Sequence, residues 1–81
     1  MIMQEALIGY IQKLLPDAVV TVTDRTGTMD HFNIRVVSDG FKDKGLLDRH
    51  RLVYRALDEP LKDGRIHAVE IKALTPDESN E

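Results

Sequence analysis

The sequence predicts an α+β domain whose elements follow the order helix, strand, strand, helix, strand. Three observations favour this class. Two segments place apolar residues at helical spacing, three others alternate as strands do, and the two kinds of segment are interspersed. A three-stranded sheet with both helices on one face would bury the apolar side of every segment. The chain has 81 residues, so we expect residues 1–81 to form a single domain.

The first half of the chain is expected to form one helix and a strand hairpin. Residues 3–15 carry an apolar stripe at helical spacing. Pro16 ends this helix, because the residue before a proline disfavours helical backbone. Residues 18–24 and 31–38 alternate in the manner of strands. The short polar loop between these two strands predicts that they pair antiparallel.

The second half is expected to supply the other helix and the last strand. Residues 39–45 form a loop rich in glycine and charge, and an apolar stripe then predicts a helix over residues 46–57. A short linker closed by Pro60 and Gly64 separates this helix from a third strand over residues 66–73.

The tail from about residue 76 is expected to fray, apart from one helical turn that Thr75 can cap and Pro76 can begin. The predicted core comes from the inward positions of the three strands and the second helix. Its members are Val20, Val22, Phe32, Ile34, Val36, Val53, Leu57, Val69 and Ile71.

Composition excludes several classes of function. The chain has no cysteine, so we expect no disulfide, no thiolate ligand and a reducing, cytoplasmic environment. No segment approaches the ~20 apolar residues of a membrane span, and the N-terminal segment lacks the basic start of a signal peptide. Ser38 has no neighbouring His–Asp set, and no nucleophile elbow or phosphate-binding loop occurs. We therefore expect a binding domain rather than an enzyme.

Three histidines are candidate metal ligands, because imidazole is the commonest protein ligand for metals. His50 falls on the apolar stripe of the second helix, where we expect a core-edge histidine with a satisfied hydrogen bond. His31 begins the second strand with outward parity, and His67 begins the third strand with the parity of its core face. If both strands start at the same end of the sheet, the imidazoles of His31 and His67 can converge there. Because their parities differ, the loop between the first two strands or a twist must then turn His31 toward His67. Two imidazoles are too few to close a metal site, so a partner must supply the other ligands.

A second candidate site is a run of basic residues around the second helix. Its members are Lys42, Lys44, Arg49, Arg51 and Arg55. A helix with such residues can lie along phosphates or in a groove of nucleic acid. Asp43 and Asp48 interleave with them, and the net charge of the chain is −3. A solvated helix face is therefore the competing interpretation.

Two short motifs in the second half of the chain are distinctive. Residues 41–54 read FKDKGLLDRHRLVY, and the triplet Ile66-His67-Ala68 follows. The triplet Arg49-His50-Arg51 at this separation from Ile66-His67-Ala68 is specific, whereas either triplet alone is a weak signal. With the segment KALTPDE at 72–78, these motifs make the chain similar to the BolA family over about residues 5–78.

The resemblance implies a fold similar to a type II KH domain, which agrees with the element order above. It implies an adaptor that binds a monothiol glutaredoxin and shares a two-iron two-sulfur cluster, in cluster trafficking or iron homeostasis. The cluster would form only in that complex, with thiolates from the glutaredoxin and glutathione. The implied ligands from this chain are His67 of the Ile-His-Ala motif and a residue from the loop between the first two strands. The segment Asp30-His31-Phe32 makes His31 that candidate.

Two alternatives stay open at this point. Some members of the family are described as DNA-binding regulators, which here would use helix 46–57 and the preceding loop. That loop, DGFKDKG at residues 39–45, lacks the G-x-x-G spacing with which KH domains clamp a nucleic-acid backbone. The other alternative is an interaction domain without a metal. We expect the free protein to be a monomer that binds no membrane.

Overall fold

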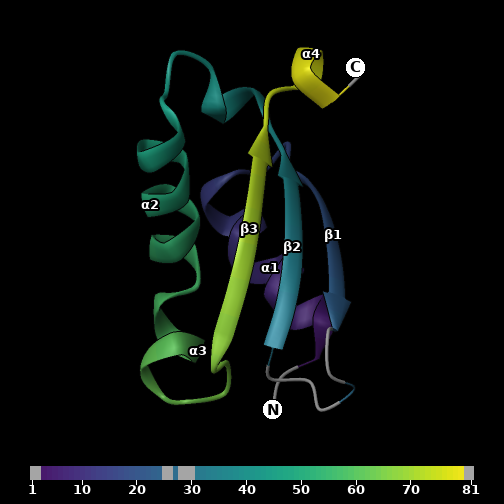
Figure 1. Cartoon of the computed structure of the whole chain (residues 1–81), viewed down its shortest axis with the longest axis vertical. Helices are drawn as coiled ribbons and strands as arrows, with labels where there is room; N and C mark the ends of the chain where they lie inside the picture. Colours follow the sequence, from purple (N-terminus) through teal and green to yellow (C-terminus); the bar gives the residue numbers. More distant parts are fainter. Residues whose placement is uncertain (1–2, 25–26, 28–30, 80–81) are drawn as a thin grey trace.

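Helices packed on a three-stranded sheet make up the described chain (Figure 1). The structure, a computed structural model, describes residues 3–24, 27 and 31–79. The elements in chain order are α1 (Gln4–Leu14), β1 (Val19–Asp24), β2 (His31–Val37), the 3-10 turn η1 (Asp39–Phe41), α2 (Leu46–Ala56), α3 (Asp58–Lys62), β3 (Ala68–Leu74) and α4 (Pro76–Ser79). The strand order is β1-β2-β3, with β1 antiparallel and β3 parallel to the central β2. The predicted element order and the predicted hairpin are therefore confirmed.

One face of the sheet is covered by helices and the other is open. α1 packs against β1, and α2 packs against β3. In Figure 1 the open face is turned toward the viewer, with α1 behind it. The exposed side chains that line a shallow hollow on this open face are Thr21, Thr23, Asn33, Glu70 and Lys72. The helices are thus on one face, as the sequence predicts.

The core lies between the covered face of the sheet and the helices. Five predicted core residues are buried: Phe32, Ile34, Val36, Val53 and Leu57. The other four pack against this cluster but are only partly buried: Val20, Val22, Val69 and Ile71. All four belong to β1 or β3, the edge strands, whereas the buried strand residues just named lie on the central β2. An edge strand has a neighbour on one side only, so its inward side chains stay partly accessible.

The linker predicted around Pro60 is a helix instead. α3 starts directly after α2, with Leu57 ending one helix and preceding the other. Pro60 lies within the first turn of α3 and is buried. The first amides of a helix have no intrahelical acceptor, so a proline there removes no hydrogen bond. The prediction was wrong because a proline ends a helix only where it removes a hydrogen bond or clashes, and Pro60 stands in the first turn, where it does neither.

The predicted last turn is present as α4. The Thr75 hydroxyl accepts a hydrogen bond from the Glu78 amide at 3.3 Å, and the Glu78 carboxylate accepts one from the Thr75 amide at 2.9 Å. This reciprocal pair is a capping box, and it confirms Thr75 as the cap. Residues 80–81 of the tail lie outside the described residues. In the described part of the chain, no helix is long and apolar enough to cross a membrane.

Candidate metal centre

The histidines at the starts of β2 and β3 come together at one end of the sheet. The two strands run parallel, so both begin at the lower end in Figure 1. His31 is in register with Ala68, which places His67 one residue before the paired segment. The two imidazole rings lie edge to face, with centroids 5.8 Å apart and planes at 83°. The convergence that the sequence made conditional on strand direction is therefore present.

His67 is exposed, which corrects the prediction that it shares the core face of the third strand. β3 begins at Ala68, so strand parity does not extend back to His67. The residue that enters the core at this point is Ile66, which is 2% exposed. Its amide donates to the Pro60 carbonyl at 3.2 Å, and Gly64 turns the chain with φ of +83°. His67 thus follows a buried anchor and faces solvent, where a partner can reach it.

The spacing of the two rings is close to that of two imidazoles bound to one metal ion. Two imidazoles on a tetrahedral ion with metal–nitrogen bonds of about 2.0–2.1 Å have ring centroids roughly 5 Å apart. The observed 5.8 Å between His31 and His67 is close to that separation. In the described residues, no group of three or more His, Cys, Asp or Glu side chains is placed to hold a metal. Two imidazoles would need further ligands from another molecule to complete a metal site. Asp30, the residue before His31, lies outside the described residues.

His50 does not have the hydrogen bond that we expected for it. Its Nε2 is buried and has no hydrogen-bond partner in the described structure. Val53 of α2 and Leu57, which directly follows the helix, continue the apolar stripe and offer no hydrogen-bonding side chain. A buried polar atom without a partner lowers the stability of the fold. His50 also lies away from the ring pair of His31 and His67.

Arg49 is separated from the other candidate nucleic-acid residues by its contacts within the fold. Its guanidinium donates to the carbonyls of Lys44 at 2.9 Å and Ala73 at 3.1 Å, and to the Glu78 carboxylate at 2.6 Å. Only 14% of its side chain is exposed. These bonds tie α2 to β3 and α4, and they leave Arg49 little capacity for a phosphate.

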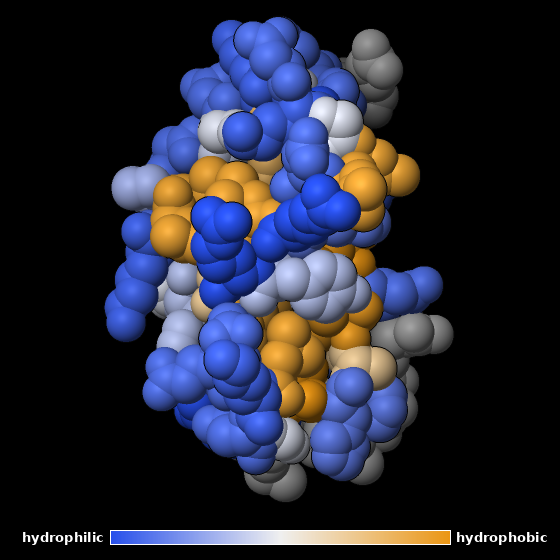
Figure 2. Space-filling view, turned by 90° about the vertical axis from the view of Figure 1, so that its left-hand side faces the viewer, coloured by the Kyte–Doolittle hydropathy of each residue, from blue (hydrophilic) through white to orange (hydrophobic). Residues whose placement is uncertain are grey.

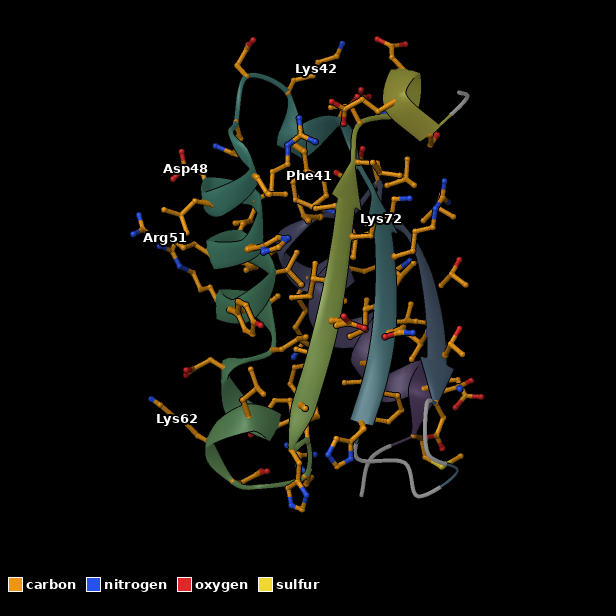
Figure 3. All side chains as sticks on the ribbon, in the orientation of Figure 1. Phe41, Lys42, Asp48, Arg51, Lys62 and Lys72 are labelled. Atoms are coloured by element: carbon orange, nitrogen blue, oxygen red, sulfur yellow. The ribbon has the colours of Figure 1, made fainter. Side chains whose placement is uncertain are left out.

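Three of the remaining basic residues share one surface of α2. Lys44, Arg51 and Arg55 line a hollow together with Asp48 and Leu52. Asp48 lies 3.9 Å from the Arg51 guanidinium, and Figure 3 shows both side chains on the side of α2 that faces away from the sheet. The basic charge of this surface is therefore partly offset by an acid.

The same surface also carries exposed apolar side chains. Figure 2 shows blue side chains interrupted by orange patches on this side of the molecule. Leu46, Leu47 and Tyr54 of α2 are all exposed. Lys42, beyond the N-terminal end of α2, lies 3.9 Å from Asp39. A mixed surface of this kind is less typical of a phosphate-binding face than an uninterrupted basic one.

Sequence reasoning predicted the Thr75 cap but missed the return contact of Glu78 and the other polar contacts at the far end of the sheet. The Arg49 guanidinium and the Thr75 amide hold the pKa of Glu78 at about 2, well below the ordinary value of 4.5. The pKa of Asp17 is also lowered, first by the hydrogen bond from the Ser38 hydroxyl at 2.6 Å. A signal existed for one of these contacts, because Thr-Pro-Asp-Glu has the spacing of a capping box. The pair of Asp17 with Ser38 depends on the fold and has no local signal.

Comparison with known proteins places these features in a family. The family model described as BolA-like protein matches residues 16–78. The chain is 49% identical over 55 residues to "Protein BOLA1, chloroplastic" of Arabidopsis thaliana, covering 68% of this chain and 34% of that protein. It is 54% identical over 48 residues to "SufE-like protein 1, chloroplastic/mitochondrial" of the same organism, covering 59% of this chain and 13% of that protein. The chain thus spans about a third or less of the length of these two curated relatives.

The solved structures agree with the sequence relatives. The structure of BolA1 from Arabidopsis thaliana superposes with a TM-score of 0.82 at 36% identity, covering 91% of this chain and 92% of that one. The agreement extends over nearly the whole of both chains, so it applies to the complete arrangement of helices and sheet. With a family model that matches most of its residues and a solved relative of the same fold, the chain belongs to the BolA-like protein family.

Proposed function

We propose that this chain is an adaptor that binds a monothiol glutaredoxin and co-ligates a two-iron two-sulfur cluster shared with it. The observation that carries the proposal is the edge-to-face pair of His31 and His67 at one end of the sheet, with centroids 5.8 Å apart. The partner and the cluster are those that the resemblance to the BolA family implies. The exposure of His67 and the membership of the family support the proposal.

Each component of the complex has a distinct part in this proposal. His67 and His31 each present an imidazole nitrogen, while the buried Ile66 and the pairing of β2 with β3 hold the two backbones in place. This chain has no cysteine, so the thiolates come from the glutaredoxin and glutathione. The cluster, when bound, supplies the iron and sulfide that such a complex can transfer. Imidazole in place of thiolate raises the reduction potential of such a centre.

The test is co-purification with a monothiol glutaredoxin and glutathione, followed by visible absorption and circular dichroism. We expect the isolated chain to be colourless and the complex to be coloured. A complex that forms without colour would favour the interaction domain without a metal. A well-folded His67→Ala complex with an unchanged cluster spectrum would reject His67 as a ligand.

The second candidate function is nucleic-acid binding, and the hollow that Lys44, Arg51 and Arg55 share on α2 favours it. It ranks lower because Arg49 is used within the fold and Asp48 lies beside Arg51. We expect only weak binding to a labelled duplex, lost as salt is raised, because such binding depends on displaced counterions. Sequence-specific binding at physiological salt that Arg51→Ala or Lys44→Ala removes would promote this function above the first.

A further inference from the structure

Three side chains form a clamp on the bend that precedes His67. Arg65 donates through Nε to both carboxylate oxygens of Asp63, at 3.1 and 2.9 Å. Its Nη2 donates to the hydroxyl of Tyr10 at 3.0 Å, and its guanidinium carbon lies 5.8 Å from the centre of the Tyr10 ring. The backbone amide of Arg65 also donates to Asp63, at 3.1 Å. We call Arg65, Asp63 and Tyr10 the Arg65 clamp.

The Arg65 clamp joins segments that are far apart in the sequence. Tyr10 lies on α1, 55 residues before Arg65, while Asp63 follows α3 directly. Arg65 and His67 flank Ile66, whose side chain is buried in the core. The clamp therefore fixes the chain just before this anchor, two residues from the candidate ligand. A planar guanidinium with several donors is suited to hold two partners in a set orientation.

We propose that Arg65 is a positioning residue for His67, acting through the bend between α3 and β3. This inference rests on the proposed function, because it concerns how the ligand is presented to a metal. The left-handed Gly64 allows the bend to turn sharply, and the Arg65 clamp restricts the set of conformations that the bend can adopt. Ligands must be held in a productive orientation by the residues that surround them.

A role in stability alone accounts less well for the Arg65 clamp. The side chains of Arg65 and Asp63 are 36% and 46% exposed, and exposed ion pairs contribute little to folding. The surrounding chain already has its own anchors, namely the burial of Ile66 and the hydrogen bond from its amide to Pro60. What the clamp adds is a link from the bend to α1, made two residues before His67.

The experiment compares Arg65→Ala, Arg65→Lys and Tyr10→Phe with a matched control, Lys62→Ala. Lys62 is a cation of the same segment, and Figure 3 shows its side chain pointing away from the sheet. It forms an exposed pair with Asp58 at 3.3 Å, so its loss removes one charge without touching the clamp. Tyr10→Phe keeps the ring and removes only the hydroxyl, and Arg65→Lys keeps the charge but loses the planar fork.

The first measurement uses the isolated domain and needs no cluster. Nuclear Overhauser contacts between the ring protons of His31 and His67 report the ring pair directly. We expect Arg65→Ala and Arg65→Lys to weaken these contacts, Tyr10→Phe to weaken them less, and Lys62→Ala to leave them unchanged. Contacts of wild-type strength in both Arg65 variants would overturn the proposal. If Arg65→Ala fails to fold, Arg65→Lys and Tyr10→Phe decide it.

The second measurement uses the complex with glutaredoxin and glutathione. We expect cluster loss to a chelator to be faster by about tenfold in Arg65→Ala, the lower end of the range for groups that orient a ligand. Lys62→Ala should match wild type. Loss at the wild-type rate in Arg65→Ala would contradict a positioning role. If His67→Ala also loses the cluster at the wild-type rate, the proposed function is wrong. The ring contacts measured in the isolated domain then still show whether Arg65 positions His67.

Discussion

The two ends of the sheet use their polar side chains in different ways. Where β2 and β3 begin, the rings of His31 and His67 meet and His67 is exposed. Where the same strands finish, next to α4 in Figure 1, Arg49 donates to the Ala73 carbonyl and to Glu78. We call the first end the candidate functional end, because it carries the candidate ligands, and the second the structural end, because its donors and acceptors bond within the chain.

This difference separates residues that hold the fold from the candidate ligands. At the structural end the donors have acceptors within the chain, so substitution there should lower the free energy of unfolding. At the candidate functional end His67 is exposed and His31 is half-buried, so substitution of His67 should change ligation and leave folding intact. A substitution at one end that has the effect expected for the other end would contradict this division.

The largest effect is expected for His67→Ala in the complex with glutaredoxin. Loss of one nitrogen ligand should change the circular dichroism of the cluster and speed its loss by more than about tenfold, since even outer-shell changes cost about 10- to 100-fold. His31→Ala should have a smaller effect of the same kind. Thermal unfolding of the isolated His67→Ala domain should match wild type, because the side chain is exposed. A large loss of stability instead would mean that this end also holds the fold.

Arg49→Ala should have the largest effect on stability at the structural end. The change removes hydrogen bonds from a largely buried guanidinium to two carbonyls and a carboxylate. We expect the free energy of unfolding to fall by about 2–3 kcal/mol, measured by urea denaturation. The control is Arg51→Ala, an exposed residue of the same helix, which should change stability by no more than about 0.5 kcal/mol. Equal effects of the two substitutions would remove the distinction between these arginines.

The structural end should also give the domain an acid-sensitive component of stability. Hydrogen bonds from Arg49 and Thr75 lower the pKa of Glu78 from 4.5 to about 2. A carboxylate whose pKa is lower in the folded state stabilises fully above its unfolded pKa and loses that contribution as the group protonates. The contribution of Glu78 should therefore be complete above about pH 5 and disappear as the pH falls from 4.5 to about 2.

The measurement is the unfolding temperature of wild type and Glu78→Gln across this pH range at constant salt. Wild type should be the more stable protein near pH 6, and the two curves should approach each other near pH 2. The lowered pKa of Asp17 is common to both proteins, so it does not affect their difference. Curves that stay parallel over the whole range would show that Glu78 is not the source of the acid sensitivity.

Some features of the two ends could be predicted from the sequence and others could not, for physical reasons. Periodicity determines which side of a strand is buried, so the element order and the buried side chains of β2 could be predicted. His67 departs from its predicted face because it lies one residue outside β3, and strand periodicity does not extend to a bend. The contact between Arg49 and Glu78 joins residues 29 positions apart. Nothing local in the sequence specifies such a pair, because it forms only when α2 and α4 are both in place.

The smallest effect on the free energy of unfolding is expected at His50 on α2, between the two ends of the sheet. Its Nε2 is buried without a partner, and such an atom costs about 1–3 kcal/mol. His50→Leu fills similar space without a polar atom. Because leucine packs less well than the imidazole in this space, we expect the free energy of unfolding to rise by only about 1 kcal/mol. His50→Ala removes packing as well, so it should be less stable than His50→Leu and fall below wild type. Urea denaturation of the three proteins gives this order.

The order of stability of wild type, His50→Leu and His50→Ala also shows whether His50 helps to hold the fold. If His50→Leu is as unstable as His50→Ala, the imidazole has a partner in solution, such as a buried water, and belongs with the groups that hold the fold. If His50→Leu is more stable than wild type and its complex still shows the wild-type cluster spectrum, His50 is neither a ligand nor a structural contact. Its unsatisfied nitrogen is then a cost that the fold tolerates, and the division of polar groups between the two ends does not extend to the middle of α2.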